Sequence, residues 1–443
     1  MSALRLAPLM LRPSTQGAAV LALPMIAFGI VTWLLGIVVG GARAFFTWTT
    51  PDAALYQLLA VVALALLAVP LVSLGGSAAR LSARRRDDRL AALRLLGATS
   101  GTVLALAVAE ATALALVGAI LGVAGAAATS PLIGLIPFAG EPLGASALLP
   151  ATWSIGLAAA VTLLAASSAL LSMRRVMVTP LGVARRETPA RVHWIVIVLA
   201  VAAMAIVAGA FSSFASIGAA LGVVAMVAVL GVGFGIAMLV LNLLGPWLLG
   251  VQARIQARRA SSPVRLIAAR TVLESPKAAW RQVGGVALVT FVGVIAGVGS
   301  ALLGSADAGG EMTLAADIRT GLIITIVGSF LTVACTVGLQ QAASILDGRA
   351  LSRALHHGGM DVSTMDAARR WAVLSPLLLV VAVSAIAASV LVVPLLGMAL
   401  LFEPVTVLIT AGVVVTGVVI VGVGLLVTRP LLRRVATAHV ATA

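Results

Sequence analysis

The residues best placed to contact a charged partner lie in one stretch, Arg84–Glu110, which reads RRRDDRLAALRLLGATSGTVLALAVAE. Each Arg or Asp in its first half would cost about 2.5 kcal/mol or more inside hydrocarbon. That half therefore lies in water or among lipid headgroups, and the second half continues into an apolar segment of membrane-spanning length. The side chains of this stretch can therefore make ionic and apolar contacts with a partner.

A short helix is predicted in the first half of this stretch. Leu90, Leu93 and Leu96 recur at three-residue spacing and form a narrow apolar stripe. Gly97 suits the position that ends a helix and turns the chain into the bilayer. Two interpretations follow from the residues: a solvated loop whose arginines only fix its side of the membrane, or a helix that presses onto another protein.

A second charged segment, Asp347–Arg370, reads DGRALSRALHHGGMDVSTMDAARR. It aligns with the first segment so that Leu355, His356, Gly359 and Met360 stand where the first has Leu93, Arg94, Gly97 and Ala98. His356 and His357 are neighbours that point about 100° apart on a helix, so they do not bind one metal ion together.

Few other residues carry chemistry. The only lysine, Lys277, lies in SPKAAW, so the chain has no phosphate-binding loop for ATP. Cys335 is the only cysteine, which excludes a disulfide within the chain. Glu110 stands inside an apolar segment, where it either pairs with Arg94 or another cytoplasmic arginine or reaches water at the interface.

The composition requires a membrane. Hydrophobic residues make up 61% of the 443 residues and charged residues only 10%, against about 45–50% apolar residues in soluble domains. We therefore predict an all-α polytopic membrane protein with about ten transmembrane helices. They are expected near Ala18–Val39, Ala53–Leu74, Val103–Val123, Trp153–Leu171, Trp194–Phe211, Gly222–Leu244, Val283–Leu303, Leu322–Leu339, Trp371–Pro394 and Val405–Val427.

The basic residues set the orientation. All but Arg43 and Arg319 of the 29 Lys and Arg residues fall in loops of one side, so both chain ends are predicted to be cytoplasmic. The net charge of +15 follows this loop pattern rather than one face, which argues against nucleic-acid binding. The outer segments Gly41–Asp52, Ser130–Pro150 and Gly304–Gly321 are predicted to be loops too short to form an extracellular domain.

The order of elements repeats. A surface segment, Leu4–Gln16 or Pro263–Gln282, precedes four spans with a charged segment between the second and third. We predict a first four-helix unit at 1–178 with its charged helix at 84–97, a two-helix linker at 179–259, and a second unit at 260–443 with its charged segment at 347–360.

Arg89, Leu93, Arg94, Gly97 and Ala98, followed by Glu110, resemble the signature of FtsX-like (MacB-type, type VII) ABC transporter permeases. The ten-helix layout is similar to that of antimicrobial-peptide-type permeases, without their large extracellular domain. The resemblance implies that the chain binds a separate ABC ATPase, in two copies, which holds the ATP, and that the chain itself has no cofactor. The residues it implies for ATPase coupling are Arg86, Arg89, Leu90, Leu93, Arg94, Gly97, Ala98, Leu355, His356, Gly359 and Met360, with Glu110 as a structural or coupling residue of the third span.

The resemblance implies a permease of the cell membrane, in contact with lipid, that exports or extracts an amphipathic or lipophilic substrate such as a peptide antibiotic, lipid or drug. The alternative is a permease that moves no cargo and controls a sensor kinase or a cell-wall hydrolase. An ion-coupled transporter would need ionisable residues within the spans, and Glu110 is almost the only one. Because the second segment has His356 in place of the arginine and lacks the glutamate, the two ATPase contacts are expected to differ in strength.

Overall fold

The computed structural model describes residues 19–49, 53–54, 56–61, 63–64, 67, 99–178, 194–306, 312–392 and 404–437. These residues are helical apart from one small hairpin and short connections. The chain divides into two compact units, Met1–Arg185 with Gly338–Ala343, and Arg186–Val337 with Ser344–Ala443. The all-α fold predicted from the composition is confirmed.

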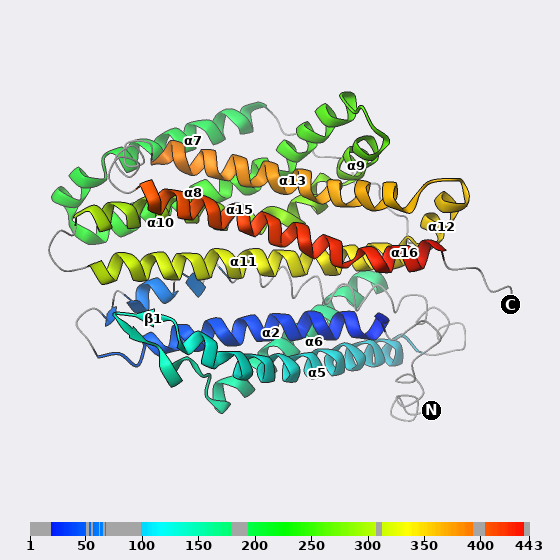
Figure 1. Cartoon of the computed structure of the whole chain (residues 1–443), viewed down its shortest axis with the longest axis horizontal. Helices are drawn as coiled ribbons and strands as arrows, with labels where there is room; N and C mark the ends of the chain where they lie inside the picture. Colours follow the sequence, from blue (N-terminus) through cyan, green and yellow to red (C-terminus); the bar gives the residue numbers. More distant parts are fainter. Residues whose placement is uncertain are drawn as a thin grey trace. The chain divides into compact units, whose positions relative to one another are not determined.

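In the first unit, α5 (Ser100–Gly134) packs along both α2 (Ala19–Phe45) and α6 (Ala151–Val178) (Figure 1). The α2–α5 contact is made through glycine. A Cβ atom added to Gly122 would lie 2.5 Å from the carbonyl oxygen of Gly29, and one added to Gly118 would lie 2.5 Å from that of Met25. Because side chains are missing at these points, the two helix backbones approach closely, as small residues allow in membrane helices.

A hairpin follows α5. Strands β1 (Pro137–Phe138) and β2 (Glu141–Pro142) pair in antiparallel fashion, and the 3₁₀-helix η1 (Gly144–Ala147) leads into α6. The two turn residues, Ala139 and Gly140, have φ angles of 53° and 82°, as a two-residue hairpin turn requires. Ser130–Pro150 is thus not the plain loop predicted, because α5 continues through Pro131 to Gly134 before the hairpin begins.

The second unit contains the remaining described helices. They are α7 (Trp194–Ser212), α8 (Phe214–Arg258), α9 (Pro263–Glu274), α10 (Pro276–Ala306), α11 (Met312–Asp347), α12 (Arg349–His357), α13 (Val362–Leu391), α15 (Pro404–Val427) and α16 (Arg429–Thr437). Helices α7 and α8, which the sequence analysis sets apart as a linker, thus lie inside this compact unit.

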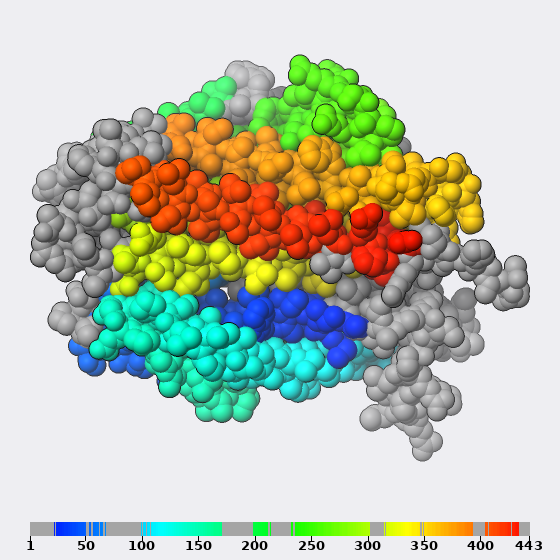
Figure 2. Space-filling model, viewed as in Figure 1, coloured from blue at the N-terminus to red at the C-terminus, as the bar shows by residue number. Residues whose placement is uncertain are grey.

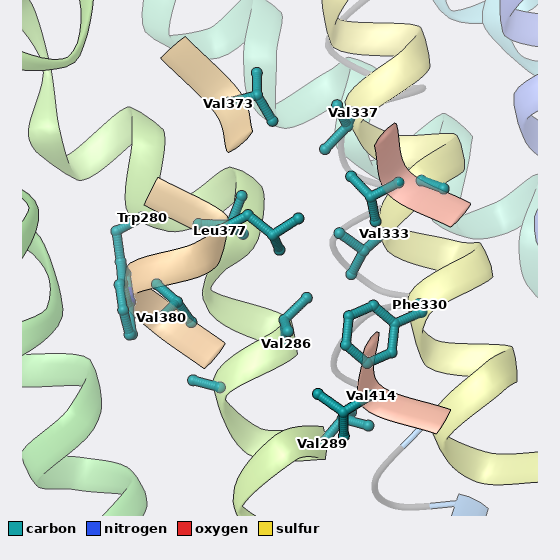
Figure 3. Packing of buried hydrophobic residues seen from close by; sticks show 14 of the residues in the cluster. Trp280, Val286, Val289, Phe330, Val333, Val337, Val373, Leu377, Val380 and Val414 are labelled. Atoms are coloured by element: carbon teal, nitrogen blue, oxygen red, sulfur yellow. The ribbon is translucent and has the colours of Figure 1, made fainter. Parts of the chain in front are cut away.

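The core of this unit is built from large side chains. Val286 of α10, Leu377 of α13 and Phe330 of α11 meet in its centre, with Val414 of α15 beside them and Trp280 at one edge (Figure 3). Leu377 and Phe330 are fully buried. The cluster also includes Leu249 of α8 and Val272 of α9, so the unit is held by side-chain packing that draws on six helices.

Among the described residues, eight helices are long and apolar enough to cross a membrane, and α7 adds the shorter apolar stretch Val198–Ala210. Half of the predicted span Ala53–Leu74 lies outside the described residues. The count of ten and the cytoplasmic placement of both ends remain predictions.

Several predicted boundaries were wrong. Gly304–Gly321 was expected to be a loop, yet α10 reaches Ala306 and α11 begins at Met312. Pro263–Gln282 was expected to be one surface segment, and it is divided between α9 and α10 at Ser275, since a residue before proline avoids the helical conformation. The first surface segment, Leu4–Gln16, lies outside the described residues.

Candidate functional site

Helix α12 forms the second charged segment and ends in a well-defined turn. The N–H of Met360 donates to the carbonyl of Leu355 at 2.9 Å, and the N–H of Gly359 donates to that of His356 at 3.0 Å. Gly359 has φ +89°. These are the paired bonds and the left-handed residue of a Schellman ending, in which glycine carries no steric cost. Gly359 therefore fixes the angle between α12 and the chain that follows.

The exposed face of α12 carries apolar side chains. Leu351 is 65% exposed and Leu355, four residues later, is 38% exposed. Residues four apart lie on one face of a helix. The ring Nδ1 of the half-buried His356 lies 3.3 Å from the carbonyl oxygen of Met360, within the terminal turn.

Helix α13 begins directly after this turn, with Asp361 as its N-cap residue. The Ser363 hydroxyl donates to the Asp361 carboxylate, and this hydrogen bond lowers the pKa of Asp361 below its usual value. In the first unit α5 begins after Thr99, whose hydroxyl accepts from the N–H of Thr102 at 3.3 Å. In the alignment of the two charged segments Thr99 and Asp361 stand at the same position, so α5 and α13 begin in the same register.

The base of α13 carries an ion cluster centred on Asp366, which is 1% exposed. Its Oδ1 accepts from Arg369 Nη2 at 2.7 Å, and its Oδ2 lies 3.1 Å from Arg370 Nε and 3.9 Å from Arg429 Nε. Arg369 Nη1 also donates to Thr428 Oγ1 at 2.8 Å. Thr428 separates α15 from α16, so the cluster joins α13 to the α15–α16 junction.

This ion cluster was missed by the sequence analysis. Asp366, Arg369 and Arg370 stand at i, i+3 and i+4, a spacing that signals contact along one helix turn. Arg429 and Thr428 come from a distant part of the chain, and no sequence pattern links them to Asp366. Helix α16 also packs on α12 (Figure 2, red and gold). The helix α12, the base of α13 and the junction at Thr428 therefore meet at one end of the second unit.

Other polar residues connect helices within this unit. Gln252 of α8 donates to the carbonyl of Ser375 at 3.0 Å, and the Ser375 hydroxyl donates to Gln256 at 3.1 Å. The indole N–H of Trp280 donates to Asn242 at 3.1 Å. Asn242 is therefore a helix-packing contact between α8 and α10.

Of the residues expected to couple the first unit, Arg86, Arg89, Leu90, Leu93, Arg94, Gly97 and Ala98 lie outside the described residues, so the predicted helix 84–97 remains a prediction. Glu110 is half-buried on α5. In the described part of the chain, no three His, Cys, Asp or Glu side chains are grouped to hold a metal ion.

The helices of spanning length and apolar composition define a multi-pass protein of the cell membrane. Residues 61–181 match the family described as FtsX-like permease C-terminal. The match and the many apolar helices together fit an FtsX-like ABC transporter permease, as the resemblance implied. No curated protein and no solved structure matches the chain.

The matched segment contains the whole of the first charged stretch, Arg84–Glu110. Permeases of this family are membrane subunits of transporters, are not themselves ATPases, and typically work with an ABC ATPase. The match therefore suggests that this chain is the permease subunit of an ABC transporter.

Proposed function

We propose that the chain couples ATP hydrolysis by a separate ABC ATPase to the export or extraction of an amphipathic or lipophilic substrate. Two ATPase copies bind it, one at Arg84–Gly97 and one at Asp347–Met360. ATP stays in the partner, since the chain's only lysine is not in a phosphate-binding loop. The observation that carries the proposal is the exposed leucine pair of α12, of which Leu355 aligns with Leu93 in the family-matched segment.

The leucine pair suits a groove on a partner. Leu351 and Leu355 are exposed on a short helix that also contains Arg349 and Arg353. Such a helix can place i and i+4 apolar side chains into a groove. The turn at Gly359 then holds the helix at a fixed angle to α13, so that a push on α12 moves the base of a span.

A lipophilic cargo fits the surfaces of the first unit. The described residues of α2 and α5 line an open groove of about 700 Å³, within the usual size range of small-molecule sites. Met25, Ile26, Ile30, Trp33 and Leu121 form much of its wall. An apolar groove on spanning helices favours an acyl chain or a similarly apolar molecule over a charged one.

The test uses the permease in lipid nanodiscs with the ABC ATPase encoded beside it. We expect co-purification and an ATP turnover that rises when the permease is present. Leu355→Glu should weaken ATPase capture at the second site, Leu93→Glu at the first, and the double variant should abolish it. Arg258→Glu changes another exposed charge at the end of α8 and is the matched control.

Full ATPase capture and turnover in the double variant would refute the two coupling sites. Substrate movement is tested with a fluorescent lipid and a fluorescent lipopeptide in proteoliposomes. Movement of either one supports transport. If neither moves and a sensor kinase or a cell-wall hydrolase co-purifies, the chain is a signalling permease and the transport part of the proposal is wrong.

A further inference from the structure

We propose that the Asp366 ion cluster is the joint that carries movement of α12 into α15 and α16, and that Asp366 is a positioning residue for coupling in the second unit. The ion cluster comprises Asp366, Arg369, Arg370, Thr428 and Arg429. The inference rests on the proposed function, because it assigns a role in transmitting the movement of a bound ATPase.

Two contacts of the ion cluster cross between helices. Arg369 Nη1 on α13 donates to Thr428 Oγ1 at 2.8 Å, and Arg429 Nε on α16 lies 3.9 Å from Asp366 Oδ2. The Thr428 hydroxyl in turn donates to the carbonyl of Leu425 at 2.8 Å. Thr428 is 8% exposed. The junction between α15 and α16 is therefore bonded to α13 on one side and to the last turn of α15 on the other.

The path from α12 to this joint is short. Helix α12 connects to α13 through the turn at Gly359 and packs directly on α16 (Figure 1). Leu432 of α16 is 4% exposed, which anchors α16 in the unit. The helices α12, α13 and α16 thus form a closed set of contacts, in which the ion cluster is the polar link between α13 and α16. A displacement of α12 therefore acts on α13, through the turn at Gly359, and on α16, through direct packing.

The geometry of the ion cluster suits a contact that changes. One buried carboxylate faces three guanidinium groups, so positive charge is in excess. Asp366 Oδ2 lies near Arg370 and Arg429 but makes no aligned hydrogen bond with either. The pair that crosses to α16 is also the longest of the three. A small shift of α16 can therefore strengthen or weaken the Asp366–Arg429 pair while Arg369 keeps its own bond to Asp366.

A purely stabilising role explains the ion cluster less well. Removing charges from water costs energy that a buried ion pair often fails to recover, and apolar replacements are frequently neutral. Buried polar groups can instead specify one arrangement of helices. Here they specify the arrangement of α13 with α15 and α16 at the end of the unit where α12 lies.

The test compares variants of the full permease bound to its ATPase in nanodiscs. Thr428→Val keeps the side-chain shape and removes the hydrogen bond between Arg369 and Thr428. Arg429→Gln removes the positive charge of α16 that pairs with Asp366 of α13. Asp366→Asn removes the negative charge that all three arginines face. Gln256→Ala breaks the bond between α8 and Ser375 and serves as the matched control for the loss of an interhelical polar contact on α13.

We expect Thr428→Val and Arg429→Gln to keep wild-type thermal stability and ATPase capture. Their permease-dependent ATP turnover should fall on the order of tenfold, within the range found for coupling residues. Gln256→Ala should keep turnover. The single cysteine, Cys335, allows a second readout in a Cys335→Ala background with spin labels at His357 and Leu426. In the parent the label distance should shift when nucleotide is trapped, and in Asp366→Asn this shift should be lost.

Unchanged turnover in Thr428→Val and Arg429→Gln, or a label-distance shift in Asp366→Asn equal to that of the parent, would overturn the inference. So would a loss of turnover that only tracks thermal stability, or an equal loss in Gln256→Ala. If Leu355→Glu uncouples the ATPase and the ion-cluster variants do not, the inference fails alone. If the wild-type chain captures no ATPase, the proposed function fails and the inference fails with it.

Discussion

The two units bring their first and third spanning helices together by opposite means. In the first unit α2 meets α5 through Gly29 and Gly122, so that backbone lies against backbone. In the second unit α10 meets α13 through large side chains, with Leu377 of α13 fully buried (Figure 3). Both pairs fill the same place in the order of elements. The order of helices and the register of their starts are thus shared, while the chemistry of the contact is not.

The same contrast holds at the bases of the third spans. In the first unit the acidic residue is Glu110, ten positions into α5. In the second unit it is Asp366, much nearer the start of α13 and surrounded by three arginines. The family match covers only the first unit. The two units therefore share the position of the charged segment, but the acidic residue near the base of the third span differs between them in position and in surroundings.

The largest effect is expected in the side-chain core of the second unit. Leu377→Ala removes most of a fully buried side chain and leaves a cavity, which costs about 2–5 kcal/mol of unfolding free energy. Leu378→Ala is the control, because the neighbouring Leu378 is 47% exposed. Thermal unfolding in detergent, followed by tryptophan fluorescence, measures both. Equal shifts in the two variants would show that the core does not lie where Figure 3 places it.

The glycine contact between α2 and α5 should be destabilised when side-chain volume is added, whereas the core of the second unit is destabilised when volume is removed. Gly122→Ala places a Cβ atom 2.5 Å from the carbonyl oxygen of Gly29, so α2 and α5 must separate. We expect a loss of about 1–3 kcal/mol, the usual range for overpacking. Gly156→Ala on α6 meets nothing within 4 Å and should be neutral or stabilising by about 0.5–1 kcal/mol.

These variants sharpen the comparison, because the sign of the glycine effect depends on the contact. If Gly122→Ala and Gly156→Ala both stabilise the protein, α2 and α5 are not in backbone contact, and the two units pack by the same means. The readout is the midpoint of thermal unfolding together with protease resistance of α2 and α5.

Much of the fold was predictable because short stretches of sequence determine where its helices lie. The span Val405–Val427 was predicted almost to the residue of α15, since a run of apolar residues needs no partner to be recognised. The start of α13 was predicted nine residues too late, at Trp371 rather than Val362, because Asp366, Arg369 and Arg370 are costly in lipid. In the structure Asp366 and Arg369 neutralise each other and Arg369 bonds Thr428, so the helix begins before the apolar run.

The candidate site was predictable only in part, for the same reason. The glycine at position 359 and the leucine at 355 could be placed by the repeat, since both act within their own helix turn. The Asp366–Arg429 contact spans more than sixty residues of sequence, and the α2–α5 contact depends on which glycines face each other. Such features depend on the tertiary arrangement, which hydropathy and spacing do not contain.

The smallest expected effect tests whether the two charged segments end alike. Gly359→Ala forces a residue with a Cβ atom into φ +89°, at a cost of roughly 1–2 kcal/mol. The cost is local to the turn, so we expect a lower occupancy of the ATPase at the second site and little change in the unfolding midpoint. Gly97→Ala is the matching change in the first segment, and Gly299→Ala, within α10 and with nothing within 4 Å, is the control.

If Gly97 ends its helix in the left-handed conformation as Gly359 does, Gly97→Ala weakens ATPase capture at the first site by a similar factor. The measurement is capture of the ATPase by permeases in which the other site is disabled by Leu93→Glu or Leu355→Glu. An unaffected Gly97→Ala would mean that the first segment ends by a different turn. The two units would then share the position of this turn but not its geometry, as they share the positions of their third spans but not the packing that holds them.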